Sequence, residues 1–367
     1  MIDLATGRYT AAEVQRALHA AGGSRRVWYR LERLNAYKIK LGELRMETGS
    51  IEQDANASIM RTGRFTVRDE AGVNWHAELL RPLFCLEMPD GGTAEYPLGV
   101  FYMPTITKSG YKHIYREIEA YDTTMLLWDD QVPERYSIAR GTKYTSALSG
   151  IFSSVGVHDA IIEPSDSVTE TTLEWEAGTT KGEIVRQLME ADNYAPLSAD
   201  AWGRWVCRKY RDPRSRFAEY SYKADEMSVL LPAQTLVEDV YGLPNVFIGI
   251  VSRPDRTPMS FSYEITDATS PLAAVNRGGR RIADTKIYDD TASAIALEAA
   301  VRRRAGRATA YLSQLTFETA AMPHHGAEDV LWLEAGEVRG KYLETKWTLP
   351  LEPGSGMTHE AQKEDTL

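Results

Sequence analysis

The stretch Met259-Ser-Phe-Ser-Tyr-Glu-Ile265 alternates apolar and polar residues, a pattern typical of a half-buried β-strand. Turn residues end this strand before Pro271, and a helix is predicted from Thr291 to Arg304, ahead of Gly306. Acidic residues at the helix start and three arginines at its end suit the helix dipole. Two further strands are predicted, over 310–319 and 327–333. The block carries no nucleophile motif, metal motif or phosphate loop, which indicates an architectural role.

This order of elements resembles the second tube-like domain of tail hub proteins from tailed bacteriophages and related injection machines. The resemblance rests on Thr269-Ser-Pro271, the helix of small residues, the strand around Leu315-Thr-Phe317 and the strand that starts at Glu328-Asp-Val330. Upstream, Leu188 to Asn193 and Asp200 to Val206 resemble the short helix and hairpin that join the two tube-like domains of such hubs. The resemblance therefore implies a chain with two tube-like domains.

Length and composition are those of a folded, multidomain protein. A chain of 367 residues exceeds one ordinary hydrophobic core, so two or three domains are expected. Apolar residues make up 43% and charged residues 26%, both ordinary values for a folded protein. The net charge of -10 argues against stable nucleic-acid binding, because phosphate neutralisation needs clustered Lys and Arg. An acidic surface would instead suit a conduit through which DNA slides.

The two cysteines and the N-terminus give information about the cellular compartment. Cys85 and Cys207 each lie in an apolar neighbourhood and are predicted to be buried free thiols rather than a disulfide. The first residues, Met1 to Gly7, lack the basic and apolar regions of a signal peptide. No apolar run approaches membrane-spanning length. The chain is therefore expected to be made in a cytoplasm, with no membrane span.

The N-terminal part divides into an arm and a β-domain. Residues 1–27 are predicted to form a helical arm, because Thr10 and Glu13 make a capping box ahead of one apolar stripe. Residues 28–131 are predicted to form the first tube-like β-domain, a barrel or sandwich. Short alternating strands separated by regular glycine turns are typical of that architecture.

The rest of the chain divides into three parts. Residues 132–220 are predicted to form a smaller α/β connector, and residues 221–351 a second tube-like β-domain with an inserted helix. The polar residues 352–367 are predicted to be disordered. The predicted fold class is thus α+β, mainly β, with two tail-tube-like β-barrel or sandwich domains joined by the connector.

One apolar strand is the candidate interface. The run 246–251 is apolar on both faces, so it is predicted to be either a central strand or a strand buried between subunits. A ring-forming chain would bury such a strand against its neighbour. The predicted interface residues are Val246, Phe247, Ile248, Ile250 and Val251.

Two adjacent histidines are the part of the sequence that most resembles a metal-binding cluster. His324 and His325 precede Glu328 and Asp329. Adjacent side chains on an extended segment point in opposite directions, so the two rings chelate one ion poorly without other ligands. The pair lies between a proline and a glycine, and the sequence is therefore interpreted as an exposed loop tip.

Other candidate chemistry is also weak. Residues 178–182 contain two glycines and a lysine but lack the spacing of a phosphate loop, so a helix start is preferred. Acidic pairs occur at 129–130, 289–290 and 328–329, and sequence adjacency does not place two carboxylates across a cleft. No catalytic residue, cofactor or metal is predicted, and the chain is not expected to be an enzyme.

The resemblance implies a structural hub at the tip of a phage tail. Such a hub forms a homotrimeric ring that closes the distal end of the tail tube, adapts its sixfold symmetry to a threefold tip and leaves a lumen for DNA. Its implied partners are the distal tail or tube protein, the tape-measure protein and a tail fibre, spike or receptor-binding protein. The alternative reading is an adhesion module that holds a surface glycan with exposed aromatic residues.

Overall fold

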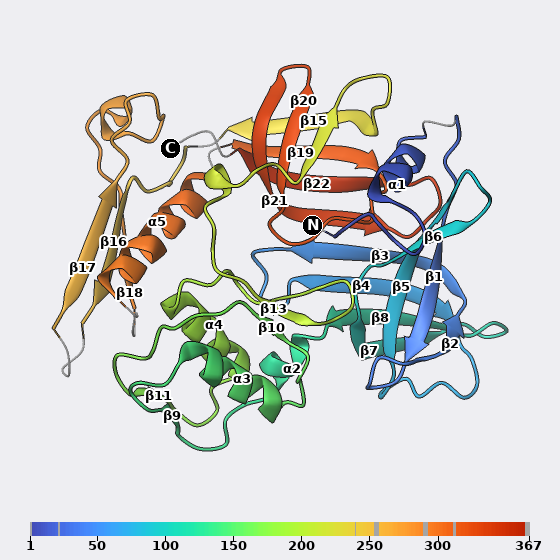
Figure 1. The fold of residues 1–367 in the computed structure, drawn as a ribbon, viewed down its shortest axis with the longest axis horizontal. Helices are drawn as coiled ribbons and strands as arrows, with labels where there is room; N and C mark the ends of the chain where they lie inside the picture. Colours follow the sequence, from blue (N-terminus) through green and yellow to red (C-terminus); the bar gives the residue numbers. More distant parts are fainter. Residues whose placement is uncertain are drawn as a thin grey trace.

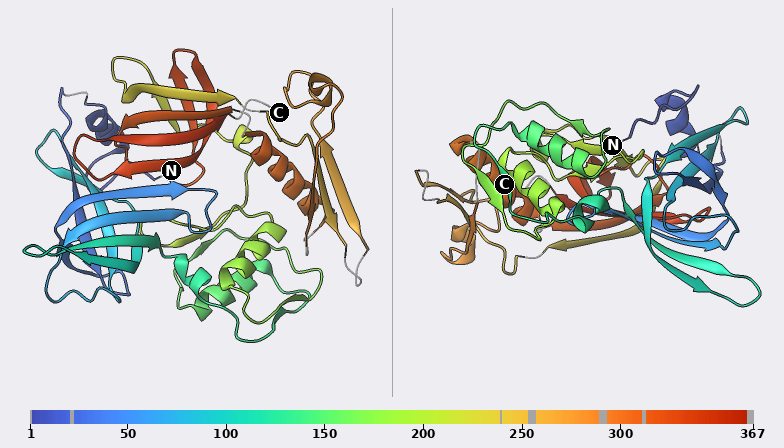
Figure 2. Two further views of the ribbon diagram at one scale, coloured as in Figure 1. Left: turned by 180° about the vertical axis from the view of Figure 1, so that it is seen from behind. Right: turned by 90° about the horizontal axis from the view of Figure 1, so that it is seen from below.

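The computed structural model describes residues 2–20, 23–238, 240–252, 257–288, 293–310 and 313–363. Its largest feature is a 14-stranded sheet that runs through two adjacent β-domains (Figure 1). Two smaller lobes, the connector and an insert, lie beside this β-body and contact each other (Figure 2). The predicted class, mainly β with two joined β-domains and a smaller α/β connector, is confirmed.

The first β-domain follows the alternation seen in the sequence. Phe65 and Val67 point into its core while their neighbours along the strand are partly exposed. Its strands are β1 (Val27–Leu34), β2 (Lys40–Leu44), β3 (Met46–Asp54), β4 (Arg61–Arg68), β5 (Leu79–Glu87), β6 (Thr93–Pro97), β7 (Phe101–Ser109) and β8 (Tyr115–Asp122). The main path of pairing runs β3-β4-β8-β7-β5-β1-β2.

The second β-domain is built around one long strand. Its strands are β14 (Tyr220–Lys223), β15 (Leu230–Glu238), β19 (Ser313–Ala320), β20 (Val330–Ala335), β21 (Val338–Pro350) and β22 (Gly356–Lys363). A register shift between Glu344 and Lys346 interrupts the pairing of β21 with β22. Because of this bulge, Glu344 faces inward before it and Trp347 faces inward after it.

The two β-domains share a sheet and a core. Strand β21 pairs antiparallel with β3, from Lys346 opposite Asp54 to Pro350 opposite Ser50. Side chains from both domains belong to a single hydrophobic cluster. The halves therefore form one continuous body.

The prediction that residues 352–367 are disordered is wrong for the part that is described. Strand β22 lies between β19 and β21 and pairs with both. Its inward positions are Met357, His359 and Ala361, all buried. The sequence pattern did not indicate this strand, because the central inward position is a histidine and the apolar alternation is therefore interrupted. Residues 364–367 lie outside the described residues.

The N-terminal helix α1 (Ala11–Leu18) begins at the predicted capping box. The Thr10 side chain accepts a hydrogen bond from the Glu13 main chain, and the Glu13 carboxylate accepts one from Thr10 N–H at 2.8 Å. Val14 and Leu18 are fully buried in the main core. The arm is thus packed into the β-body.

The connector has its own core. Its elements are α2 (Met125–Asp129), β9 (Tyr136–Ile138), α3 (Tyr144–Ser154), β10 (Ile161–Ile162), β11 (Leu173–Trp175), α4 (Lys181–Ala191), β12 (Ser198–Ala199) and β13 (Trp205–Cys207). Strands β12 and β13 form the predicted hairpin. Helix α4 starts after Thr180, whose hydroxyl accepts from Glu183 N–H, so the glycine-rich segment 178–182 is the helix start that was predicted.

The insert within the second β-domain has a sheet of its own as well as a helix. Strands β16 (Val246–Val251), β17 (Met259–Glu264) and β18 (Ala283–Ile287) pack against helix α5 (Ala294–Ala310). The predicted helix end at Arg304 is wrong, because α5 continues through Gly306 to Ala310. One glycine costs a helix only about 1 kcal/mol, and alanines follow it. The predicted start at Thr291 lies outside the described residues.

Both cysteines are buried, as the sequence predicted. Cys85 in β5 and Cys207 in β13 are buried free thiols. Burial raises the pKa of both thiols to about 12. No described helix is both long and apolar enough to cross a membrane.

Candidate functional site

The main path of strands in the large sheet has an open edge at each end. In the described part of the chain, the outer side of β2 and the outer side of β15 pair with no further strand. Both edges carry exposed apolar side chains: Leu41 on β2 is 51% exposed and Leu236 on β15 is 47% exposed. Open edges with exposed apolar residues are templates for pairing with another chain. These two edges lie on different β-domains, at opposite ends of one path of strands.

The predicted interface strand β16 is the central strand of the insert. It pairs with β17 on one side and β18 on the other, which confirms the reading as a central strand. Phe247 and Val251 are fully buried in the core of the insert. Gly249 faces α5 with them, since a Cβ there would lie 2.4 Å from Val301. These inward residues are covered by the chain's own helix.

The other predicted interface residues lie differently. Val246 is buried, whereas Ile248 and Ile250 alternate with the inward set and are half-buried. Exposed Ile287 lies opposite Ile250 on the neighbouring strand β18. The interface role of Ile248 and Ile250 stays a prediction.

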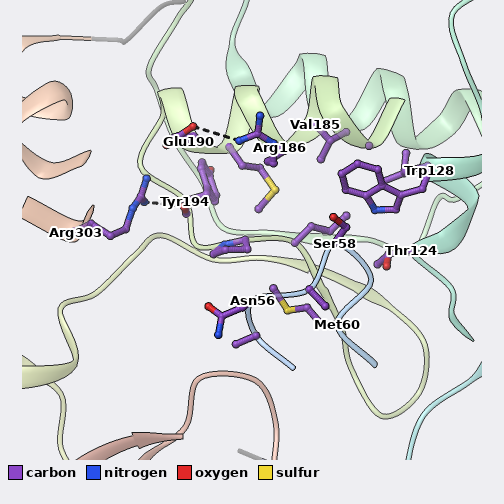
Figure 3. A pocket seen from close by; sticks show the side chains of 17 residues that line it. Asn56, Ser58, Met60, Thr124, Trp128, Val185, Arg186, Glu190, Tyr194 and Arg303 are labelled. Carbon is purple, nitrogen blue, oxygen red and sulfur yellow. Dashed lines mark hydrogen bonds and ion pairs between the residues drawn. The ribbon is translucent and has the colours of Figure 1, made fainter. Parts of the chain in front are cut away.

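A cleft lies where the connector, the insert and the first β-domain meet (Figure 3). Its volume is about 250 Å³, below the ~300–1,000 Å³ typical of ligand pockets. Arg186 and Glu190 of α4 form an ion pair beside it at 3.8 Å. Arg303 of α5 donates to the Tyr194 carbonyl at 3.0 Å. The contact of Arg303 with Tyr194 joins the insert to the connector, and the cleft is best described as a packing junction.

A second contact also joins the insert to the connector. Lys286 of β18 donates to the Glu190 carboxylate at 2.6 Å. Its ammonium lies 4.8 Å from the ring centre of Tyr288. Both side chains of the ion pair are about one-quarter to one-third exposed, so it contributes modestly to stability and mainly fixes orientation.

The histidine pair is buried, so its interpretation as an exposed loop tip is wrong. His324 is fully buried and His325 is 2% exposed. The Nδ1 atom of His325 lies 2.6 Å from one carboxylate oxygen of Glu344, and Nδ1 of His359 lies 2.6 Å from the other. These residues come from the loop before β20, from β21 and from β22. The carboxylate that holds His325 is that of Glu344, which lies well beyond the neighbouring acidic residues in the sequence.

Hydroxyl groups lie within hydrogen-bond distance of the Nε2 atoms of both His325 and His359. The Tyr222 hydroxyl lies 2.6 Å from Nε2 of His325, and the Thr319 hydroxyl lies 2.8 Å from Nε2 of His359. Burial alone would raise the pKa of Glu344, but the charge and hydrogen bond of His325, with the hydrogen bond of His359, hold that pKa at about 2. Burial lowers the pKa of His359 against the opposing effect of Glu344. The carboxylate is thus ionised and its charge is shared with imidazoles.

Two of the three acidic pairs, 129–130 and 328–329, lie in the part of the chain that the structure describes. Asp130 pairs with Lys181 at 2.5 Å. Asp329 is buried and accepts a hydrogen bond from Gly326 N–H at 2.6 Å. The pair 289–290 lies outside the described residues. The described pairs thus have local structural partners on separate elements.

Sequence comparison alone finds no relative: no protein-family model matches the chain, and no curated protein does. Solved structures do match. A tail protein from Neisseria meningitidis MC58 has a TM-score of 0.66 at 10% identity, over 92% of this chain and 98% of that one. The 43 kDa tail protein of prophage MuSo2 from Shewanella oneidensis has a TM-score of 0.64 at 10% identity, with coverage of 92% and 99%.

A third similar structure comes from a secretion system. The Escherichia coli c3393 protein is a component of the type VI secretion system, with structural similarity to the T4 bacteriophage tail proteins gp27 and gp5. It matches with a TM-score of 0.51 at 11% identity, over 87% of this chain and 74% of that one. The chain therefore has the fold of phage tail proteins over almost its whole length, and the fold that the sequence resemblance implied is confirmed.

Proposed function

We propose that this chain is a structural tail hub protein of a tailed bacteriophage. In this proposal it acts at the tip of the virion tail, as a homotrimeric ring that closes the distal end of the tail tube. The role is structural, with no catalytic step. The fold shared with phage tail proteins supports it, and the paired β-domains with two open sheet edges carry it.

The position of the open edges supports the proposed ring. Strand β2 ends the sheet in the first β-domain and β15 ends it in the second. Pairing β2 of one copy with β15 of the next is a heterologous contact, and heterologous contacts close into rings when the rotation permits. Because each chain has two β-domains, three chains present six such domains. A trimer of this kind would meet a sixfold tube on one side and a threefold tip on the other.

The remaining parts of the proposal concern partners and the lumen. The ring would contact the distal tail or tube protein on one face and a fibre, spike or receptor-binding protein on the other. The tape-measure protein would end in or near the lumen. A net charge of -10 suits a channel that DNA crosses without stable binding.

The adhesion alternative finds less support. A glycan-binding module needs aromatic side chains gathered in one open groove. The strongly exposed aromatics include Tyr111, Phe217 and Tyr241. They belong to the β7–β8 hairpin, the segment before β14 and the segment after β15, which are different parts of the molecule (Figure 1).

The mass of the purified chain in solution tests the proposal. Light scattering across a concentration series should give about three times the 41.1 kDa of one chain. Particles of that mass should show a central channel in negative-stain images. A mass of one chain at every concentration, with no ring on addition of the cognate tube protein, would contradict the hub.

A further inference from the structure

We propose that His325, Glu344 and His359 form a binding site for Zn²⁺ or a similar late first-row divalent cation in the core of the second β-domain. Their candidate ligand atoms, one from each residue, all lie within 4.8 Å of one another, and all three residues are buried. This site is independent of the proposed hub function. It would be a structural site, because it lies inside the packed core.

The fold brings the donors together from separate segments. Glu344 stands on β21 just before the bulge, and His359 stands on the adjacent strand β22. Both face the same core, and His325 reaches it from the loop ahead of β20. A cation held by these three groups would tie the loop to both strands, which the backbone pairing of β21 with β22 alone does not do.

Hydroxyl groups orient both rings. The Nε2 atoms of His325 and His359 are held at 2.6 and 2.8 Å by Tyr222 and Thr319. Both Nδ1 atoms are therefore turned toward the Glu344 carboxylate. In metal sites, a histidine that binds through one nitrogen has the other nitrogen held by such an outer partner.

The types of donor atom also suit one class of cation. Glu344 is 1% exposed, and among described residues its ion-pair partners are His325 and His359. Two imidazoles and one carboxylate are a donor set that Zn²⁺ accepts, whereas Ca²⁺ and Mg²⁺ prefer oxygen ligands throughout.

A further imidazole lies beside the set. The ring centre of His324 is 4.8 Å from that of His325. His324 is fully buried, and neither of its ring nitrogens has a hydrogen-bond partner among the described residues. A buried polar group of this kind calls for a partner such as an ion. His324 is thus a neighbouring candidate donor for a fourth position.

Cobalt substitution of the unaltered chain tests the site. The chain is unfolded with chelator, refolded with Co²⁺, and its visible absorption is recorded. We expect the d–d bands of a four-coordinate site, lost on addition of Zn²⁺, with about one Zn²⁺ retained per chain after gel filtration. Absence of both the bands and the retained zinc would overturn the proposal. The three side chains would then be held together by hydrogen bonds without a metal ion.

Matched variants locate the ion. Glu344→Gln and His359→Gln should lower the retained zinc at least about tenfold, while exposed His158→Gln should leave it unchanged. Equal zinc in all three variants would place the ion elsewhere and overturn the assignment. The cobalt spectrum of the unaltered chain decides the question even where a core variant fails to fold.

Discussion

Arg61 of the first β-domain places its guanidinium carbon 5.5 Å from the ring centre of Trp347 in the second. The guanidinium is buried. It donates hydrogen bonds to the Gln53 side chain at 2.8 Å and to the Leu98 carbonyl at 3.3 Å. Burial lowers the pKa of Arg61 and raises that of nearby Asp122, and each opposes the shift of the other. The cation–π contact with Trp347 crosses between the domains, whereas the other partners of Arg61 lie in the first β-domain.

Replacing this arginine should weaken the junction strongly. Arg61→Met removes the charge that faces buried Asp122 and leaves the Leu98 carbonyl without this donor. We expect the free energy of unfolding to fall by about 3 kcal/mol, measured by urea denaturation. The matched change at exposed Arg45, Arg45→Met, should alter it by less than about 0.5 kcal/mol. Equal small losses would show that the buried charge is not coupled to the fold.

The thiols should be inert until the chain unfolds. Because burial raises the pKa of Cys85 and Cys207 to about 12, both stay protonated at pH 8 in the folded chain. A thiol reagent such as DTNB should label both cysteines in denaturant and neither beforehand. The unfolded thiols ionise from near pH 9, so stability should fall as the pH rises from 9 toward 12. Rapid labelling of the native chain would contradict this burial.

Two glycines should respond oppositely to the same change. A Cβ at Gly249 would lie 2.4 Å from Val301, so Gly249→Ala should push α5 off its sheet and cost about 1–3 kcal/mol. Gly306 lies within α5 with open space around it, so Gly306→Ala should stabilise by about 1 kcal/mol. Thermal unfolding measures both. A Gly249→Ala variant that is not destabilised would mean that β16 presents its other face to α5.

The open edges should control self-association. Leu41→Lys on β2 and Val237→Lys on β15 place a charge on each free edge, and edge lysines disfavour strand pairing. Each should reduce the mass found by light scattering to that of one chain without lowering the melting temperature. Ile161→Lys, a control at a similarly exposed site in the connector, should keep the unaltered mass. Edge variants that still form trimers would place the contact on another surface.

Sequence patterns predicted the elements whose inward residues are apolar. The alternation at Phe65 and Val67 and the apolar run at 246–251 gave strands where the structure has them. The capping box at Thr10 also located a helix start. These features depend on neighbours a few residues apart, which is the range that periodicity can detect.

The sequence failed where polar residues satisfy one another across the fold. His325, Glu344 and His359 are inward residues, but each reads as a surface residue when taken alone. Their partners lie on different strands, so no local pattern reveals that burial is compensated. The same cause hid β22. The open edges were missed as well, because strand order depends on long-range pairing.

Strand β22 also sets an order of events during synthesis. It lies between β19 and β21, yet it is the last of the three to leave the ribosome. Strands β1 to β8 are contiguous and pair among themselves, so the first half can close while translation continues. The second half keeps a gap at its centre until residue 363 emerges. A nascent chain therefore exposes the facing edges of β19 and β21 until β22 is available to pair with both.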